Sequence, residues 1–131
     1  MVSVVKMLVE AERRKATRRF PRDTAFAVLR PDFTKLGKIK DISGAGLAFK
    51  YIAYDGQTRD TPDIDIFLSG DRFYLSKIPS KIIYDNKIGE ENQVFLSLFE
   101  TRQCGLQFGK LRQDQVTQLE FFLKNYTTAT A

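Results

Sequence analysis

The most basic part of the chain is the segment from Glu12 to Arg22, ERRKATRRFPR. It contains six basic residues and one acid, a local balance of +5, which equals the formal net charge of the whole chain. The chain has 21 basic and 16 acidic residues, so the other positions hold 15 of each and cancel. Because the excess charge lies in one segment and not over the domain as a whole, it predicts a localised anion site rather than a broad electrostatic face.

A second polar motif, DISGAG, spans Asp41 to Gly46 between two strand-like runs. Asp and Ser side chains hydrogen-bond to nearby backbone groups in turns, and glycine permits positive φ. Such turns are common wherever two strands are joined closely. Taken alone, the motif is therefore interpreted as a hairpin turn.

Together the two motifs resemble those of the PilZ domain family. The family pattern is Arg-x-x-x-Arg, followed one strand later by Asp/Asn-x-Ser-x-x-Gly, and it is matched here by residues 14–18 and 41–46. The resemblance extends to the preceding Glu-Arg pair (12–13), to GLAF (46–49) and to a late RxxGLQF run (102–108). It implies a small six-stranded β-barrel with a C-terminal helix, which binds the bacterial second messenger cyclic diguanylate.

The resemblance also implies a role for each ligand-binding residue. Arg14 and Arg18 would hold phosphate and guanine. Asp41 would accept hydrogen bonds from guanine N1 and N2, since a carboxylate is an acceptor only. Ser43 would add a hydroxyl contact, and Gly46 would leave room for the turn and for the base.

The basic run offers two registers for its motif. Lys15-x-x-x-Arg19 would place lysine where the family has arginine, so the register from Arg14 to Arg18 is preferred. That register also agrees with the Glu-Arg-Arg sequence that precedes the motif in the family. Arg13 and Arg19 then become auxiliary contacts or solvated charges that steer an anionic ligand. Gly44 is a further auxiliary position.

The rest of the chain predicts a mainly β fold: short antiparallel strands that form a closed or nearly closed barrel, with a short N-terminal helix and a C-terminal helix. The resemblance implies that the barrel has six strands. An apolar stripe predicts an amphipathic helix over residues 1–12, and apolar spacing predicts a second helix over 113–126 that plugs or flanks the barrel. The barrel domain is expected to span 13–126, followed by a disordered tail, 127–131. The strand-like runs are 24–30, 36–42, 46–52, 63–68, 72–78, 80–86, 93–100 and 104–111.

Composition argues against several function classes. The chain has no histidine and one cysteine, Cys104, which argues against a Cys/His dyad, a Cys/His zinc cluster and an internal disulfide. We expect no metal site, no cofactor and no enzymatic activity. The apolar runs are too short to cross a bilayer and no export signal is visible, so we expect a cytoplasmic protein without membrane insertion.

Three functions stay open. The favoured one is a receptor or adaptor that binds cyclic diguanylate and signals to an unidentified partner protein through loop and helix rearrangement. The second is a PilZ-like adaptor that does not bind the nucleotide. The third is a small barrel that binds single-stranded nucleic acid, for which the charge should be spread over the strands. Because both motifs are present and the excess charge lies in one segment, no nucleic-acid partner is expected. Monomer or dimer, and one ligand molecule or an intercalated pair, stay open.

Overall fold

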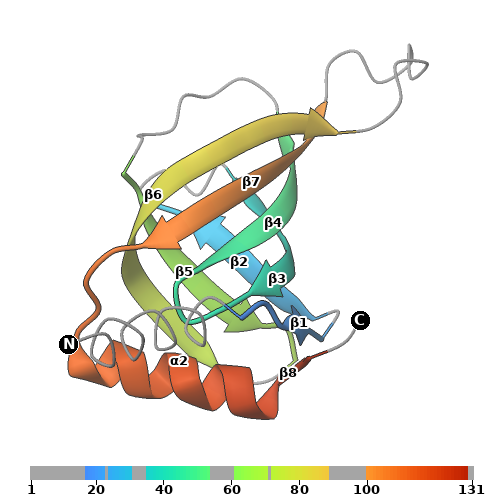
Figure 1. Ribbon diagram of the computed structural model, residues 1–131. Helices are drawn as coiled ribbons and strands as arrows, with labels where there is room; N and C mark the ends of the chain where they lie inside the picture. The colour runs from blue at the N-terminus through green and yellow to red at the C-terminus, as the bar shows by residue number, and fades with distance from the viewer. Residues whose placement is uncertain are drawn as a thin grey trace, which may run out of the picture.

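The chain folds into a closed six-stranded antiparallel barrel, which confirms the predicted fold class (Figure 1). The computed structural model describes residues 17–22, 24–30, 35–53, 61–70, 72–88 and 100–129. The expected helix over residues 1–12, together with Arg13 and Arg14, lies outside these ranges. Around the barrel the order is β2-β3-β4-β7-β6-β5. The strands are β2 (Ala25–Leu29), β3 (Leu36–Ile42), β4 (Gly46–Ala53), β5 (Asp63–Leu68), β6 (Tyr74–Ile88) and β7 (Glu100–Phe108).

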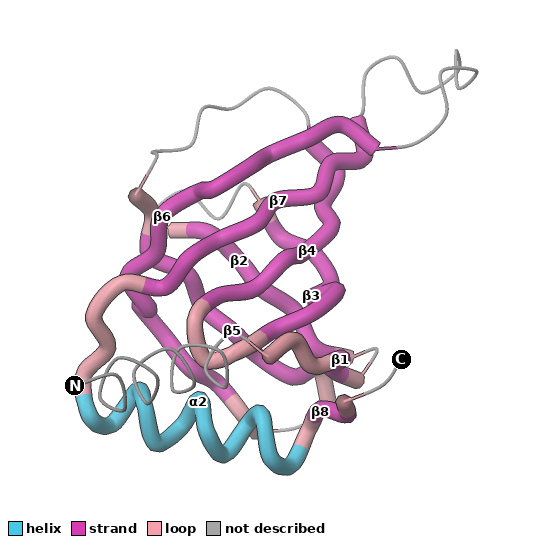
Figure 2. The backbone as a smooth tube through the Cα atoms, in the orientation of Figure 1, coloured by secondary structure: helices cyan, strands magenta, loops and turns pink. Residues whose placement is uncertain are grey.

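The runs 72–78 and 80–86, predicted as two strands, form the single long strand β6 (Figure 2). The first part of β6 pairs with β5 up to Pro79, and the second part pairs with β7 from Ser80 onward. Proline donates no backbone hydrogen bond, so it fits where a strand changes partner. The prediction of a break at Pro79 was therefore wrong, because the residue marks a change of neighbour within one strand.

Helix α2 (Gln113–Asn125) lies across one end of the barrel, as Figure 1 shows. Leu119 and Phe122 are buried and belong to the same core cluster as the inward side chains of the strands. The ring of Phe122 packs 5.2 Å from that of Phe73 and 5.9 Å from that of Tyr126. The predicted C-terminal helix is confirmed, and it ends one residue earlier than expected.

The chain after α2 is ordered by a short strand pair. Strand β8 (Thr127–Thr128) pairs antiparallel with β1 (Phe20–Pro21), and Figure 2 shows the two side by side at the end of α2. The Nε of Arg19 also donates to the Thr127 hydroxyl at 2.7 Å. The expectation of a disordered tail from residue 127 was therefore wrong for Thr127 and Thr128, because β1 supplies backbone and side-chain partners for them.

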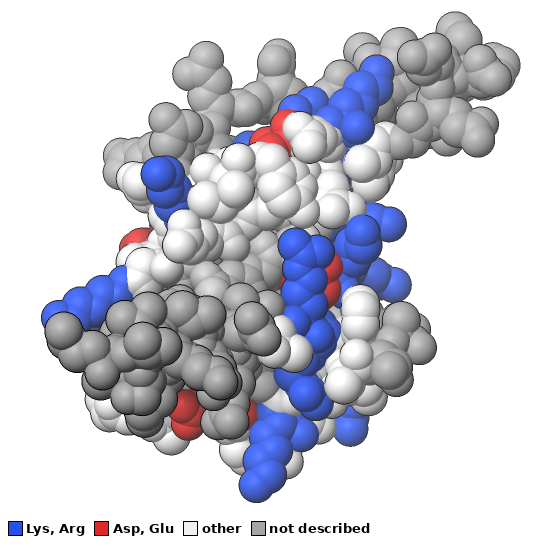
Figure 3. Space-filling model, in the orientation of Figure 1, with Lys and Arg blue, Asp and Glu red and all other residues white. Residues whose placement is uncertain are grey.

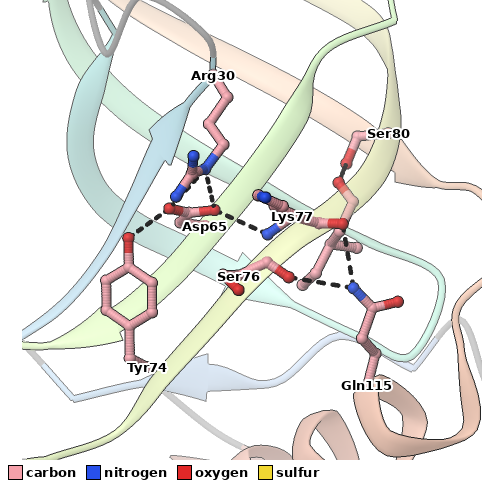
Figure 4. A network of polar contacts seen from close by, with 8 residues as sticks. Arg30, Asp65, Tyr74, Ser76, Lys77, Ser80 and Gln115 are labelled. Atoms are coloured by element: carbon pink, nitrogen blue, oxygen red, sulfur yellow. Dashed lines mark hydrogen bonds and ion pairs between the residues drawn. The ribbon is translucent and has the colours of Figure 1, made fainter.

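A buried carboxylate joins three strands of the barrel (Figure 4). Asp65 of β5 has no exposed surface. Its oxygens accept hydrogen bonds from Arg30 Nε at 2.9 Å, from the Tyr74 hydroxyl, and from the backbone N–H of Lys77 at 2.8 Å. Lys77 has φ of 55°, a left-handed conformation that is uncommon for a residue with a side chain. By accepting this bond, Asp65 stabilises a local kink in β6, at the point where the pairing of β6 with β5 shifts in register.

Helix α2 is hydrogen-bonded to the same kink through Gln115. The side-chain amide of Gln115, which is buried, donates to the carbonyl oxygens of Ser76 at 3.1 Å and Lys77 at 3.0 Å (Figure 4). Its oxygen accepts from the backbone N–H of Arg112 at 3.0 Å. The side-chain amide of Gln115 thus accepts a hydrogen bond at the start of α2 and donates hydrogen bonds to two carbonyls of the barrel. The position of α2 consequently depends on the β6 kink that Asp65 stabilises.

We expect Asp65→Asn to lower the free energy of unfolding by about 3 kcal/mol, as is typical when one partner of a buried ion pair is removed. The amide would turn a donor toward Arg30 or Lys77, which are donors themselves. Asp63→Asn, on the same strand but exposed, is the matched control and should change stability by no more than about 0.5 kcal/mol. Urea unfolding of both variants is the measurement. Equal effects of the two substitutions would contradict the structural role of Asp65.

The stabilisation by Asp65 should also depend on pH. Burial by itself would raise the pKa of Asp65, but hydrogen bonds from Arg30, Tyr74 and the Lys77 backbone outweigh burial and lower the pKa below its ordinary value of 3.8. A lowered folded-state pKa means that the stabilisation is complete above 3.8 and is lost as the pH falls through the folded-state value. The difference in unfolding free energy between wild type and Asp65→Asn should therefore shrink between about pH 5 and about pH 2. A difference that stays constant over this range would contradict the assignment.

Candidate functional site

The DISGAG motif forms the turn between β3 and β4, which confirms its interpretation as a hairpin turn. The Ser43 N–H donates to the Gly46 carbonyl at 2.8 Å, and the Ser43 hydroxyl accepts from the Ala45 N–H at 3.1 Å. The Ala45 carbonyl accepts from the N–H of Phe108 at 2.7 Å, which fixes the turn to the end of β7. Ser43 is buried and takes part in the turn itself.

Gly46 is required at the start of β4 by the close approach of a neighbouring strand. Its φ is not positive; among the described glycines only Gly70 has a positive φ. A Cβ built on Gly46 would lie 2.0 Å from the carbonyl oxygen of Leu106 on the neighbouring strand β7. Glycine is therefore needed here for the close approach of β4 to β7, and this approach helps to set the position of the turn.

Asp41 lies on the outer face of the barrel because β3 contains a bulge. Strict alternation would place Asp41 on the same side as Ile39, which is a core residue. The register shifts between Ile39 and Asp41, so that Asp41 is opposite Ala48 and Ile42 is opposite Leu47. The extra residue, Lys40, thus turns Asp41 outward and returns Ile42 to the core, which is the known effect of a bulge.

The structure brings Arg18 of the first motif to Asp41 of the second. Arg18 Nη1 lies 4.0 Å from Asp41 Oδ2. The Arg18 side chain is 74% exposed, whereas that of Asp41 is 11% exposed. Within the described part of the chain, this distant ion pair is the one interaction of the Asp41 carboxylate. A largely desolvated carboxylate with unused acceptor capacity is costly unless a donor completes it.

Arg19 is oriented by other partners. Its backbone exchanges two hydrogen bonds with Ile42, at 2.8 and 3.0 Å, so the chain after Arg18 lies along the end of β3. Its guanidinium donates to Thr127, beyond α2. Arg18 and Arg19 are both described and were both candidate ligand contacts. Of the two, Arg18 is therefore the one that lies beside Asp41. Arg13, Arg14 and Lys15 lie outside the described residues.

Sequence reasoning missed a row of side chains on the outer face next to Asp41. Across neighbouring strands, Asp41 is opposite Ala48, Ala48 opposite Gly105, and Gly105 opposite Tyr84. The Tyr84 ring covers Gly105, because a Cβ there would lie 2.1 Å from a ring carbon. Three strand spacings separate Asp41 from Tyr84, about 14 Å between backbones. The row therefore consists of a carboxylate, the two small buried residues Ala48 and Gly105, and an aromatic ring that covers Gly105.

Tyr84 reaches this face by a second bulge. The pairing of β6 with β7 shifts between Ile82 and Tyr84, so Ile83 is the extra residue. The Tyr84 hydroxyl accepts from the side-chain amide of Gln103 at 3.0 Å, which holds the ring along the sheet. A search for alternating apolar residues does not find Tyr84, since neither bulge is visible in the sequence.

The surface around this row is basic. From 36 to 53 the chain contains three lysines and a single acid, Asp41. Lys38 and Lys50 are exposed and directly opposite each other on β3 and β4, and like charges in that arrangement destabilise a sheet. Figure 3 shows Lys and Arg side chains gathered right of the centre, over the side of the barrel where β1, β3 and β4 lie. A bound anion would relieve this repulsion.

A second partly buried carboxylate, Asp85, has no such free capacity. It accepts hydrogen bonds from the Tyr51 hydroxyl, from Lys35 Nζ at 2.9 Å and from Arg102 Nε at 2.9 Å. Burial would raise the pKa of Asp85, but the bonds from Tyr51, Lys35 and Arg102 outweigh it and lower the pKa. Because each oxygen already has donors, this cluster is a structural network and not a binding site.

Comparison with known proteins leaves the resemblance to the PilZ family as a hypothesis from the motifs. In the described ranges, no group of His, Cys, Asp and Glu could hold a metal ion. No described helix is both long enough and apolar enough to cross a membrane. No family model, no curated protein and no solved structure matches the chain.

Proposed function

We propose that this protein binds cyclic diguanylate on the outer face of its barrel and acts as a receptor or adaptor toward a partner protein. The observation that carries the proposal is the state of Asp41, a nearly buried carboxylate whose described partner is one exposed arginine at 4.0 Å. The motif resemblance supplies the ligand class. The basic surface around Asp41 supports an anionic ligand.

The chemistry of guanine suits this carboxylate. Guanine presents N1–H and N2–H₂ as adjacent donors, and a carboxylate has two acceptor oxygens that match them. Arg18 has its donors in a planar fork that suits phosphate or the O6 and N7 acceptors of guanine. In the proposal Asp41 reads the base and Arg18 binds a phosphate or the second edge. Arg14 would take the other arginine role that the family resemblance assigns.

The ion pair between Arg18 and Asp41 would be exchanged on binding. A pair 4.0 Å apart whose arginine is 74% exposed contributes little, typically less than about 1 kcal/mol. Releasing it therefore costs little, and both charges gain partners on the ligand. Because Arg18 is joined through Arg19 to the end of β3, its movement would change the arrangement of the segment that leads into β1.

The neighbouring row would receive the bases. Ala48 and Gly105 are small and buried, and the half-exposed Tyr84 ring, which covers Gly105, offers its outer face for a purine to stack on. Stacking on an aromatic side chain tolerates any base, so Tyr84 would add affinity while Asp41 adds selectivity for guanine. Lys38 and Lys50 would neutralise phosphate.

Isothermal titration calorimetry with cyclic diguanylate tests the proposal. The wild type should bind, and Arg18→Ala should weaken binding about ten- to a hundredfold, the value of one charge-assisted hydrogen bond. Arg112→Ala is a matched control, because Arg112 is also an exposed arginine paired with an aspartate, at 3.0 Å on α2. It should leave the affinity unchanged.

Asp41→Ala should weaken binding at least as much as Arg18→Ala, because two acceptors are removed. Asp63→Ala, an exposed aspartate of β5, serves as its control. Wild-type protein that releases no heat with cyclic diguanylate would refute the proposal. Tight binding of a single-stranded oligonucleotide with a steep salt dependence would favour the nucleic-acid alternative instead.

Tyr84 is tested by a pair of substitutions. Tyr84→Leu should weaken nucleotide binding by about five- to a hundredfold through the loss of stacking, because one base on one ring typically contributes about 1–3 kcal/mol. Tyr84→Phe keeps the ring and loses the bond from Gln103, so it should bind within about twofold of the wild type. Equal affinities of the Leu and Phe variants would show that no base stacks on this ring.

A further inference from the structure

A hollow lined by aromatic side chains lies at the C-terminal end of α2. Its volume is about 550 Å³. Phe121 is 52% exposed, although it lies on a helix whose other aromatic residue is fully buried. The Phe121 and Tyr126 rings meet edge to face at 5.9 Å. The described lining residues are Gly70, Arg72, Phe73, Phe121 and Tyr126.

The edge of this hollow is basic. Arg72 lines it, and the guanidinium of Arg22 lies over the Tyr126 ring at 5.3 Å from the ring centroid. A smaller hollow of about 220 Å³ shares Tyr126. No acid is found among the described residues that line either hollow; those of the smaller one are Phe20, Pro21, Arg22, Asn125, Tyr126, Thr127 and Thr128. Aromatic and arginine side chains together are the composition of interface hot spots.

One short segment connects this surface to the proposed nucleotide site. Arg18 pairs with Asp41, and Arg19 exchanges backbone bonds with the end of β3. Strand β1 then pairs with β8, and the N–H of Arg22 donates to the Tyr126 carbonyl at 3.2 Å. The segment from Arg18 to Arg22 therefore contacts the β3 end at one side and the end of α2 at the other.

We propose that the hollow beside Phe121 docks an acidic segment of a partner protein that carries an aromatic or large aliphatic side chain. The apolar side chain would fill the hollow between Phe73, Phe121 and Tyr126, and the acids would pair with Arg72 and Arg22. Ligand binding changes this docking, because the segment 18–22 is shared. This coupling rests on the proposed function, whereas the docking itself does not.

Fluorescence anisotropy of a labelled synthetic peptide tests the docking. The probe is a short peptide with one phenylalanine between aspartates and glutamates, and its comparison peptide has lysines in place of the acids. The full chain should bind the acidic peptide and not the basic one. Phe121→Ser should weaken binding at least about tenfold, the scale of a hot-spot residue. Leu36→Ser is the matched control, because Leu36 is also 52% exposed but lies on β3.

Arg72→Glu is a second variant, which keeps the aromatic residues and should weaken the acidic peptide more than an uncharged peptide of the same length. Equal binding of the acidic and basic peptides, or equal effects of the Phe121 and Leu36 substitutions, would overturn the docking proposal. Absence of binding to either peptide would overturn it as well.

The coupling is tested by repeating the titration with saturating cyclic diguanylate. The peptide affinity should change at least about fivefold, the lower range of allosteric coupling. Thr127→Val, which removes the bond from Arg19, should reduce this change. Peptide binding that is identical with and without bound nucleotide would refute the coupling. If the nucleotide does not bind, the proposed function and the coupling both fail, and the peptide variants alone decide the docking.

Discussion

The candidate site depends on the alternation of side chains along β3 and on the one residue that interrupts it. A strand of regular pairing would place Asp41 in the core with Ile39, where an unpaired carboxylate would oppose folding. The bulge at Lys40 turns Asp41 outward and keeps Ile42 in the core. The second bulge, at Ile83, does the same for Tyr84 on β6. Two bulges of one extra residue each thus place a carboxylate and an aromatic ring in the same outer row, which runs across four strands of the closed barrel.

The three most buried carboxylates among the described residues are those of Asp65, Asp41 and Asp85. They differ in how many hydrogen-bond donors contact them. Asp65 and Asp85 each accept hydrogen bonds from three residues, and their pKa values are lowered despite burial. Asp65 supports the kink of β6 on which α2 rests. Asp41 lies between the two in burial, with a side chain 11% exposed against 0% for Asp65 and 21% for Asp85, but among the described residues it has one distant cation. Under the proposed function, a ligand would bring the donors that the described residues do not supply to Asp41.

Much of the fold could be predicted from the sequence. The alternating runs predicted β3 and β5 at their observed bounds, and apolar spacing predicted α2 with its buried Leu119 and Phe122. These features depend on local patterns, which a sequence carries. The two site motifs were identified by their resemblance to a family pattern, and the structure places Arg18 of the first 4.0 Å from Asp41 of the second.

Other features depend on pairing between distant segments and could not be predicted. The row from Asp41 to Tyr84 exists because two bulges match in register, and no single run of residues encodes that match. The pair of β1 and β8 consists of two residues on each side, which is too short for any alternation to appear. Gly46 was assigned to the turn by its residue type, whereas its observed role is the approach to Leu106 on β7.

The most direct test of the central claim is a nitrogen–proton NMR spectrum of the full chain, recorded with and without cyclic diguanylate. The account predicts the largest shifts at Arg18 and Arg19, at the turn from Asp41 to Gly46, and along the row of Ala48, Gly105 and Tyr84. Smaller shifts are expected at Lys38 and Lys50 and along segment 18–22 to the end of α2. Cyclic diadenylate, which lacks the guanine donors, should cause much smaller shifts. An unchanged spectrum, shifts on another face of the barrel, or equal responses to the two nucleotides would contradict the claim.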